Sequence, residues 1–271
     1  MEGGEPRSRL TPEGLIVVGS LVAATALAWW WLAAGAGMGD MPMNGMDGMP
    51  MEGMPMDMPG MPPMPWTSVY AFSVFLMWAI MMVAMMLPTA LPMILLYARV
   101  AAQRETSTAL PPTFVFVGAY VAVWTAFSAL AAGTQWWLTS LGVVDGAMRF
   151  GDRLPGVLLL IGAGLYQLTP LKRMCLSHCR SPIAFLMHHW RPGHGGALAM
   201  GLRHGAYCVG CCWFVMALLF VGGVMNLAWV AAIAVFVLAE KVLPFGQRVG
   251  QVAGAFALLA GAAFVATTLR A

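Results

Sequence analysis

The five cysteines and five histidines of this chain all lie in one window, between Cys175 and Cys212. The first group in this window is LKRMCLSHCRSP. Here Cys175, His178 and Cys179 are three and four residues apart, so they share one face if the segment is helical. Thiolate and imidazole are the side-chain ligands that zinc and copper take from proteins. The first group therefore predicts part of a metal site.

The second group is HGAYCVGCCW, in which His204, Cys208 and Cys211 again share a helix face and Cys212 adjoins them. It lies inside an apolar run, where metal-binding side chains are functional candidates by default. One buried cysteine alone is commonly an inert small hydrophobe, but five thiols in one window favour a ligand set. Three histidines between the two groups are predicted to be solvated rather than ligating: His188, His189 and His194.

Methionines form a second pattern, in the apolar stretch FLMWAIMMVAMMLPTALPM. They recur at helical spacing on two neighbouring faces: Met77, Met81 and Met85 on one, Met82 and Met86 on the other. At a helical rise of 1.5 Å per residue, the longer set covers roughly 12 Å of depth. A single methionine is often a pliable apolar filler. The repeated pairs favour a set of thioether ligands for a soft metal ion.

A third pattern is the low-complexity stretch MGDMPMNGMDGMPMEGMPMDMPGMPPMPW, which holds no Lys, Arg, His or Cys. Thioethers suit Cu(I) and Ag(I), and methionine stays usable outside the cytosol, where thiols tend to oxidise. We therefore predict an outer loop that captures metal, although a neutral linker is the alternative. Its methionines are Met38, Met41, Met43, Met46, Met49, Met51, Met54, Met56, Met58, Met61 and Met64.

The elements that must position these residues are apolar helices. The chain is 60% hydrophobic and only 9% charged, and its mean hydropathy is +0.78. This composition predicts an all-α, polytopic membrane protein with about seven (six to seven) transmembrane helices. The candidate spans are Leu15–Ala34, Val69–Pro88, Phe114–Ala132, Leu154–Pro170, Leu198–Val224, Leu227–Leu243 and Val252–Leu269.

Two further sequence features concern these helices. Pro88 and Pro92 predict a kink near the end of the second span, which continues to Tyr97. Glycine pairs with small-xxx-small spacing predict close helix approach. These pairs are Gly201/Gly205 and Gly250/Gly254.

The positive charges predict the orientation. All of the 14 Lys and Arg except Arg149, Arg153 and Arg270 fall on or near the side that holds the N-terminus. The positive-inside rule then makes the N-terminus cytoplasmic and places the Met-rich loop outside. We predict four parts: 1–34, a tail and the first helix; 35–66, the Met-rich loop; 67–249, a metal-binding core; and 250–271, a C-terminal helix. The net charge of +3 reflects this topology, so no nucleic-acid partner is expected.

Three motifs carry a resemblance to a known family: MMVAMMLP at 81–88, YQLTPLKRMCLSHCRSP at 166–182 and GAYCVGCCWFVM at 205–216. They resemble a bacterial family of predicted metal-binding integral membrane proteins, catalogued as domain of unknown function 2182, over roughly residues 65–245. The resemblance implies an all-helical protein of the bacterial inner membrane with a copper-handling or copper-chaperone role. The pattern is also analogous to the Ctr-type copper transporters of eukaryotes, which have three spans and form trimers.

The leading hypothesis is a membrane protein that captures Cu(I) at the outer face and transports it or delivers it to a cuproenzyme. The ligands progress from Met outside to Cys and His inside, so Cu(I) affinity would rise inward, and no ATP-binding motif is found. Expected partners are the copper ion, membrane lipid, a cuproenzyme or soluble copper chaperone, and a second copy of the chain.

Two alternatives stay open. The first is an intramembrane thiol–disulfide oxidoreductase that uses the CxxC at Cys208 and Cys211. The second is an assembly subunit stapled by zinc in place of copper. No catalytic residue is assigned, and Glu240 is either a buried acid or an interfacial one.

Overall fold

The computed structural model describes residues 12–35, 65–104, 109–146 and 148–268. The predicted metal-capturing loop (35–66) lies outside these residues, apart from Gly35 at its start and Pro65 and Trp66 at its end. The described part is helical, with no strand and one isolated bridge between Val144 and Phe150. Its helices are α1 (Pro12–Ala33), α2 (Ser68–Arg104), α3 (Leu110–Ser140), α4 (Arg153–Leu168), α5 (Pro170–Arg180), α6 (Pro182–His189), α7 (Gly193–Ala217), α8 (Leu219–Gly222), α9 (Leu227–Val242) and α10 (Gly246–Thr268).

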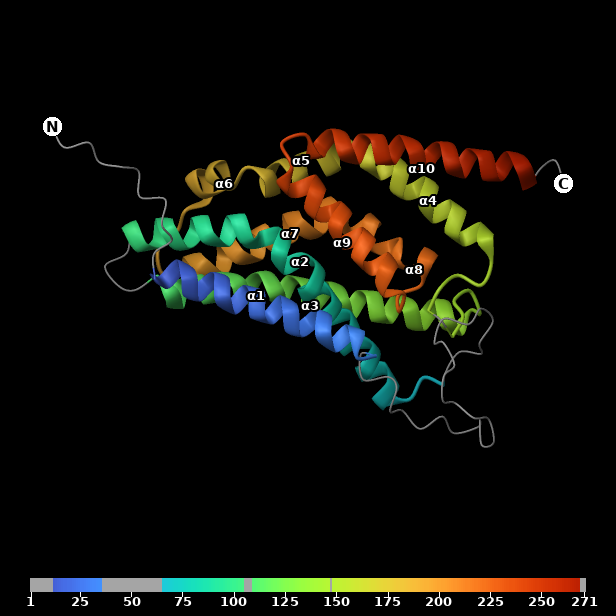
Figure 1. Cartoon of the computed structure of the whole chain (residues 1–271), viewed down its shortest axis with the longest axis horizontal. Helices are drawn as coiled ribbons and strands as arrows, with labels where there is room; N and C mark the ends of the chain where they lie inside the picture. Colours follow the sequence, from blue (N-terminus) through green and yellow to red (C-terminus); the bar gives the residue numbers. More distant parts are fainter. Residues whose placement is uncertain (1–11, 36–64, 105–108, 147, 269–271) are drawn as a thin grey trace.

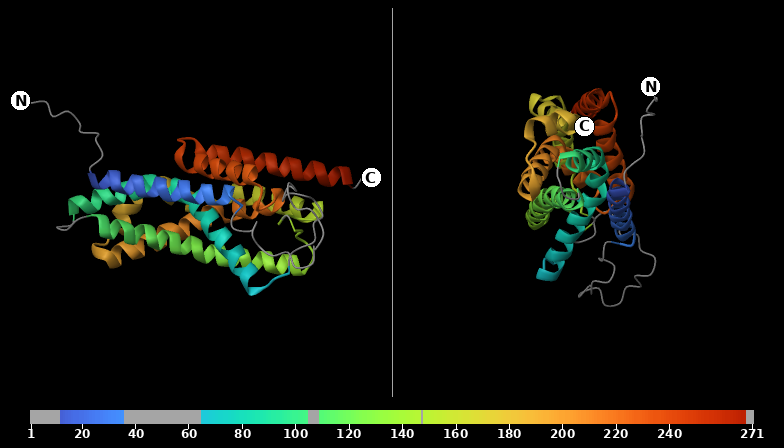
Figure 2. Two further views of the ribbon diagram at one scale, coloured as in Figure 1. Left: turned by 60° about the horizontal axis from the view of Figure 1, so that its bottom comes forward. Right: turned by 90° about the vertical axis from the view of Figure 1, so that its left-hand side faces the viewer.

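The helices form an elongated bundle (Figures 1 and 2). Helices α1, α2, α3 and α7 run along the long axis, and α2 packs on both α1 and α3, while α3 packs on α7. Helix α10 packs along α4, and α9 lies between this pair and the other helices. Large apolar side chains remain exposed on the outside of the bundle, as Leu130 and Phe256 do. A surface of this kind suits contact with lipid.

The all-helical prediction is confirmed, whereas the count of seven spans is not. Five described helices are long and apolar enough to cross a membrane: α1, α2, α3, α7 with α8, and α10. Helices α4 and α5 add a sixth span if they count as one element, bent by 65° at their junction. Helix α9 has 16 residues. It is therefore shorter than the roughly 20 residues that a straight membrane span needs.

The bend between α4 and α5 has a local cause in the Thr169–Pro170 pair. The residue before a proline is disfavoured in the helical region, and Thr169 takes an extended backbone with ψ 148°. Pro170 starts α5, and the Thr169 side chain caps it by accepting a hydrogen bond from the Lys172 backbone N–H at 3.2 Å. The break turns α5 against α7, which brings Cys175 and Cys179 to the other cysteines.

Helix α2 contains both prolines and is continuous through them. It changes direction midway along its length (Figure 1), as predicted from Pro88 and Pro92. The Met86 carbonyl, just before the first proline, accepts hydrogen bonds from the hydroxyls of Thr89 at 2.8 Å and Tyr120 at 3.1 Å. Both hydroxyls bind the backbone close to the proline-containing turn, and Tyr120 also links α2 to α3 there.

Both predicted glycine pairs mark close packing. A Cβ atom at Gly201 would lie 2.8 Å from the Ala119 Cβ, and one at Gly205 would lie 2.9 Å from the Val123 Cβ. Only glycine therefore allows α7 to approach α3 so closely. The second pair works in the same way on α10, where a Cβ at Gly254 would lie 2.7 Å from the Gln167 Cβ on α4.

Candidate metal centre

Four cysteine side chains meet where α5 crosses α7. The Cys208 sulfur interacts with the thiols of Cys179, Cys211 and Cys212. The S–H groups of Cys211 and Cys212 donate to the Cys208 carbonyl, at 3.1 Å and 2.9 Å. The three α7 thiols are at most 2% exposed, and all the cysteines are free. We call these four residues the thiol cluster.

Two side chains from other helices complete the surroundings of Cys208. The Lys241 ammonium, from the last turn of α9, lies 2.9 Å from the Cys208 sulfur and 3.2 Å from the Thr89 hydroxyl. The Tyr120 hydroxyl, from α3, lies 3.0 Å from the same sulfur. The Met86 thioether of α2 is 3.9 Å from the Lys241 nitrogen. Side chains of α3 and α9 thus contact one sulfur of α7, and α2 holds the buried cation that faces it.

The burial of Lys241 indicates that the site also contains a negative charge. A lysine that is only 8% exposed loses most of its hydration, which is costly unless an opposite charge or strong acceptor replaces the water. Its described partners are one sulfur of the thiol cluster, a hydroxyl and a thioether. Among these, the Cys208 sulfur is the group that can carry the balancing negative charge, as a thiolate.

His204 lies one helical turn before Cys208 on α7 and is 2% exposed. Its ring stacks on Tyr120, with centroids 5.6 Å apart, and on Phe116. Its Nδ1 atom is buried and has no hydrogen-bond partner among the described residues. Buried polar atoms are rarely left in this condition, so this nitrogen is available as a ligand.

The residues of the first sequence group, Cys175, His178 and Cys179, lie at different distances from the thiol cluster. Cys179 joins the thiol cluster, and Cys175 lies at its edge, where a Cβ at Gly210 would be 2.9 Å from the Cys175 sulfur. His178 instead stacks on Tyr207, with ring centroids 4.1 Å apart and its Nδ1 2.8 Å from the Met174 carbonyl oxygen. The connecting histidines are outside the cluster, and His188 and His194 are exposed.

The predicted methionines of α2 are all buried, at 1% exposure or less: Met77, Met81, Met82, Met85 and Met86. Met86 reaches the surroundings of Cys208, as its contact with Lys241 shows. Met77 and Met81 line a cavity further toward the start of α2. The methionines therefore extend from this cavity to the thiol cluster along one helix.

A second buried charge group lies beside the first. The Lys172 ammonium pairs with both carboxylate oxygens of Glu240, at 2.7 Å and 2.8 Å, and also donates to the Gln167 side chain. Arg180 donates to the Glu240 backbone carbonyl at 2.6 Å. Glu240 is therefore a buried acid. Lys172 and Lys241, counted above among the charges that predict the orientation, are both buried in the bundle, where each has a partner.

The donor set fits a soft monovalent ion better than a hard divalent one, because it offers thiols, an imidazole and a thioether but no carboxylate. The described residues contain no group of three or more Cys, His, Asp or Glu side chains already spaced for a metal ion. The thiols are arranged for hydrogen bonds to each other and to the Cys208 carbonyl. Ligation would therefore require rotation of these side chains.

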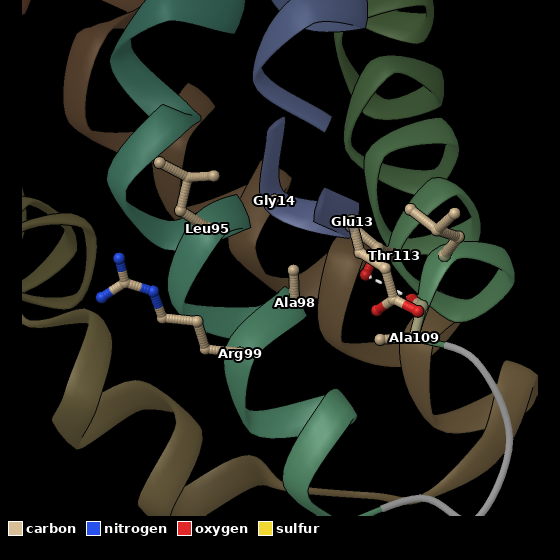
Figure 3. Close-up of a pocket in the computed structure, with 8 residues that line it drawn as sticks. Glu13, Gly14, Leu95, Ala98, Arg99, Ala109 and Thr113 are labelled. Atoms are coloured by element: carbon tan, nitrogen blue, oxygen red, sulfur yellow. Dashed lines mark hydrogen bonds between the residues drawn. The ribbon is translucent and has the colours of Figure 1, made fainter. Parts of the chain in front are cut away.

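A separate pocket at the start of α1 has a different character (Figure 3). It lies between α1, the end of α2 and the start of α3, and its lining includes Glu13, Arg99 and Thr113. Arg99 extends away from Glu13 in this view. The pocket is lined by none of the predicted metal ligands, so it adds nothing to the metal site.

Sequence reasoning missed Lys241, Tyr120 and Thr89 as members of the site. A usable signal existed for Lys241, because a lysine at the end of the apolar run VAAIAVFVLAEKVL is a functional candidate by default. Tyr120 and Thr89 carry no comparable signal, since a single hydroxyl in an apolar helix is common. Their roles come from the packing of α2, α3 and α7.

The fold and the site together define a class: a helical protein with several helices fit to span a membrane, and a buried thiol and lysine centre suited to a soft metal ion. The chain belongs to the PpoB2 copper chaperone family, whose model matches residues 75–264. The match covers the thiol cluster and Lys241, and it confirms the resemblance drawn from the three sequence motifs. Comparisons with curated proteins and with solved structures gave no match.

Proposed function

We propose that this protein binds Cu(I) at the thiol cluster inside the bundle and passes it to a copper-dependent acceptor. The observation that carries the proposal is the 2.9 Å contact between the Lys241 ammonium and the Cys208 sulfur, in the midst of three further thiols. Membership of a copper chaperone family supports copper as the cargo.

Charge balance supports Cu(I) in particular. Two thiolates and one Cu(I) ion carry a net charge of −1, which the Lys241 ammonium brings to zero. The same two thiolates with Zn(II) are already neutral, so the ammonium would be left as an unbalanced buried charge, which is costly in a low-dielectric surrounding. When both ions bind the same two thiolates, the fixed lysine therefore favours a monovalent ion over zinc.

The ligands at the centre would be the thiol cluster (Cys179, Cys208, Cys211, Cys212) with His204. Cys175 and His178, at the edge, are proposed as transfer ligands toward the face where α5 ends. The α2 methionines (Met77, Met81, Met82, Met85 and Met86) would carry the ion from the outer face of a bacterial inner membrane, and the Met-rich loop would collect it there. Exchange is expected to be fast, because Cu(I) can change partners one thioether or thiolate at a time.

The test is metal binding by the full chain, purified in detergent under anaerobic, reducing conditions. We expect about one tightly bound copper per chain by elemental analysis, and near-complete loss of it in Cys208→Ser/Cys211→Ser. Val215→Ser, which also buries a hydroxyl on α7, is the matched control and should retain the copper. Gel filtration of each variant checks that it is folded.

Three outcomes would overturn the proposal. Copper binding that is unchanged in the double variant would place the ion elsewhere. Zinc that is bound more tightly than Cu(I) would favour the zinc-stapled subunit. A Cys208–Cys211 disulfide that forms as a quinone is reduced to the quinol, and that the quinol can reduce back to two thiols, would favour the oxidoreductase.

A further inference from the structure

A small cavity lies away from the thiol cluster, between α1, the first half of α2 and the start of α9. Seven residues line it: Leu32, Met77, Met81, Val224, Met225, Leu227 and Val230. Its free volume is about 10 Å³, which is room for one occupant of about the size of a water molecule. No side chain in the lining carries a charge or an N–H or O–H group, and three of the seven are methionines.

The three methionines reach this cavity from separate parts of the chain. Met77 and Met81 are one helical turn apart on α2, and each is 1% exposed. Met225 comes from the turn between α8 and α9 and packs against the core. Methionines that merely fill a core close up the space around them. Here, three of them from two distant segments border a space that is left open.

The turn that carries Met225 is held in place from both sides. The Val224 N–H donates to the Met148 carbonyl at 3.3 Å, and the Asn226 N–H donates to the Gly223 carbonyl at 3.2 Å. The Asn226 side chain caps α9 by accepting a hydrogen bond from the Trp229 N–H at 3.1 Å. Gly223 has φ 93°, a conformation that glycine adopts without strain. Met225 is therefore presented to the cavity by an ordered turn.

The residues that line the cavity adjoin two other groups of sulfur ligands, one along the chain and one along α2. Leu32 is in the last turn of α1, just before the chain enters the stretch that holds eleven methionines. Along α2, Met77 precedes Met86 by nine residues, which is roughly 13 Å of helix at 1.5 Å per residue. Met86 in turn contacts Lys241, the partner of Cys208.

We propose that Met77, Met81 and Met225 form a second, separate site for a soft monovalent ion, Cu(I) or Ag(I). Three neutral thioethers bind such an ion and leave its charge uncompensated, so this site is weaker than the thiol cluster. A weak first site and a tight second one suit entry of the ion from the side of the Met-rich stretch. This inference rests on the proposed function for its direction of transfer, and it adds Met225 to the ligands.

The experiment is an Ag(I) titration by calorimetry, because Ag(I) is a soft monovalent ion that is not oxidised in air. The full chain is used with the eleven loop methionines changed to serine, so that the loop contributes no thioether sites. We expect one tight and one weak equivalent of Ag(I). Met225→Leu should lose the weak equivalent and keep the tight one. Met93→Leu, an equally conservative change of a buried methionine outside the cavity, should keep both.

A second measurement uses the wild-type chain, in case the loop variant does not fold. Mass spectrometry follows the oxidation of Met225 by peroxide with and without Ag(I). We expect Ag(I) to slow this oxidation at least severalfold, and to lose that effect in Met77→Leu/Met81→Leu. Met187, on the exposed face of α6, is the internal control and should oxidise at the same rate throughout.

The two proposals fail in different ways. Retention of the weak equivalent in Met225→Leu, or equal oxidation of Met225 with and without Ag(I), would overturn the cavity site. Loss of only the tight equivalent in Cys208→Ser/Cys211→Ser would support both proposals. Absence of any tight equivalent in the wild-type chain would overturn the thiol-cluster proposal and leave the cavity result standing.

Discussion

Replacement of Lys241 by methionine should change which metal ion the centre prefers. The Lys241 nitrogen lies 2.9 Å from the Cys208 sulfur. A metal ion bonded to that sulfur at about 2.3 Å would be no more than about 5 Å from the ammonium charge. The lysine therefore repels any bound metal ion, and it repels a divalent ion twice as strongly as a monovalent one.

The size of this effect follows from Coulomb's law. At about 5 Å and an effective dielectric constant of about 20, the repulsion is roughly 3 kcal/mol per unit of metal charge. Loss of the lysine therefore removes about 3 kcal/mol of repulsion from bound Cu(I) and about twice that amount from bound Zn(II). The ratio of Zn(II) to Cu(I) affinity should therefore rise by about 3 kcal/mol, or roughly two orders of magnitude. The comparison takes the same thiolates as ligands for both ions, so any effect of the lysine on the metal-free thiols is common to both and cancels in the ratio.

The assay is a competition titration of each ion against a chelator of known affinity, under anaerobic conditions at fixed pH. Lys241→Arg keeps the charge and is the matched control, so its ratio should stay within a few-fold of the wild-type ratio. A ratio that is unchanged in folded Lys241→Met would refute the charge argument. An equal rise in Lys241→Arg would show that packing, rather than charge, sets the preference.

Three further predictions test the fold and the outer segment. Gly205→Leu should lower the midpoint of thermal unfolding in detergent, because overpacking against Val123 costs about 1–3 kcal/mol of stability. Gly118→Ala is the control and should be tolerated, because Gly118 has open space around it. Equal midpoints for the two variants would contradict the close α3–α7 packing. Glu240→Gln should destabilise the chain by about 3–5 kcal/mol, because it leaves the buried Lys172 charge without its partner. The double variant Lys172→Met/Glu240→Met should recover much of this loss in the same denaturation assay. A double variant less stable than the single one would disprove this account. Replacement of all eleven loop methionines by serine should reduce cell-associated copper when copper is scarce and have little effect when copper is abundant. Elemental analysis of the cells measures this. A loss of equal size at both copper concentrations would argue against a collecting role for the loop.

Much of this protein could be predicted from local sequence patterns. A helix places residues three and four apart on one face, so the spacing of Cys208 and Cys211 already implied a common side, and that of Met77 and Met81 implied another. The small-xxx-small glycines implied close helix contacts, and the structure confirms them at Gly201 and Gly205. The family resemblance is likewise confirmed. These inferences succeeded because each depends on one helix at a time.

The span count shows where such reasoning stops. An apolar run predicts burial or a membrane span without distinguishing the two. Helix α9 is apolar but has only 16 residues, and the α4–α5 run is broken at Thr169. The burial of Lys172 and Lys241 was not predicted for a similar reason, because it depends on their partners in the fold. Those partners lie 68 and 33 residues away in the chain.

By itself, then, the sequence determined that the chain is helical and apolar, that its sulfur ligands occupy definite helix faces, and that its thiols gather in one window. Only the tertiary structure decided which faces meet. The bend after Leu168 turns Cys179 toward Cys208, α9 brings Lys241 to the same sulfur, and an ordered turn brings Met225 to the α2 methionines. The physical reason is that helical periodicity is a property of neighbouring residues. Contacts between helices depend on packing and charge pairing across long separations, which no local pattern records.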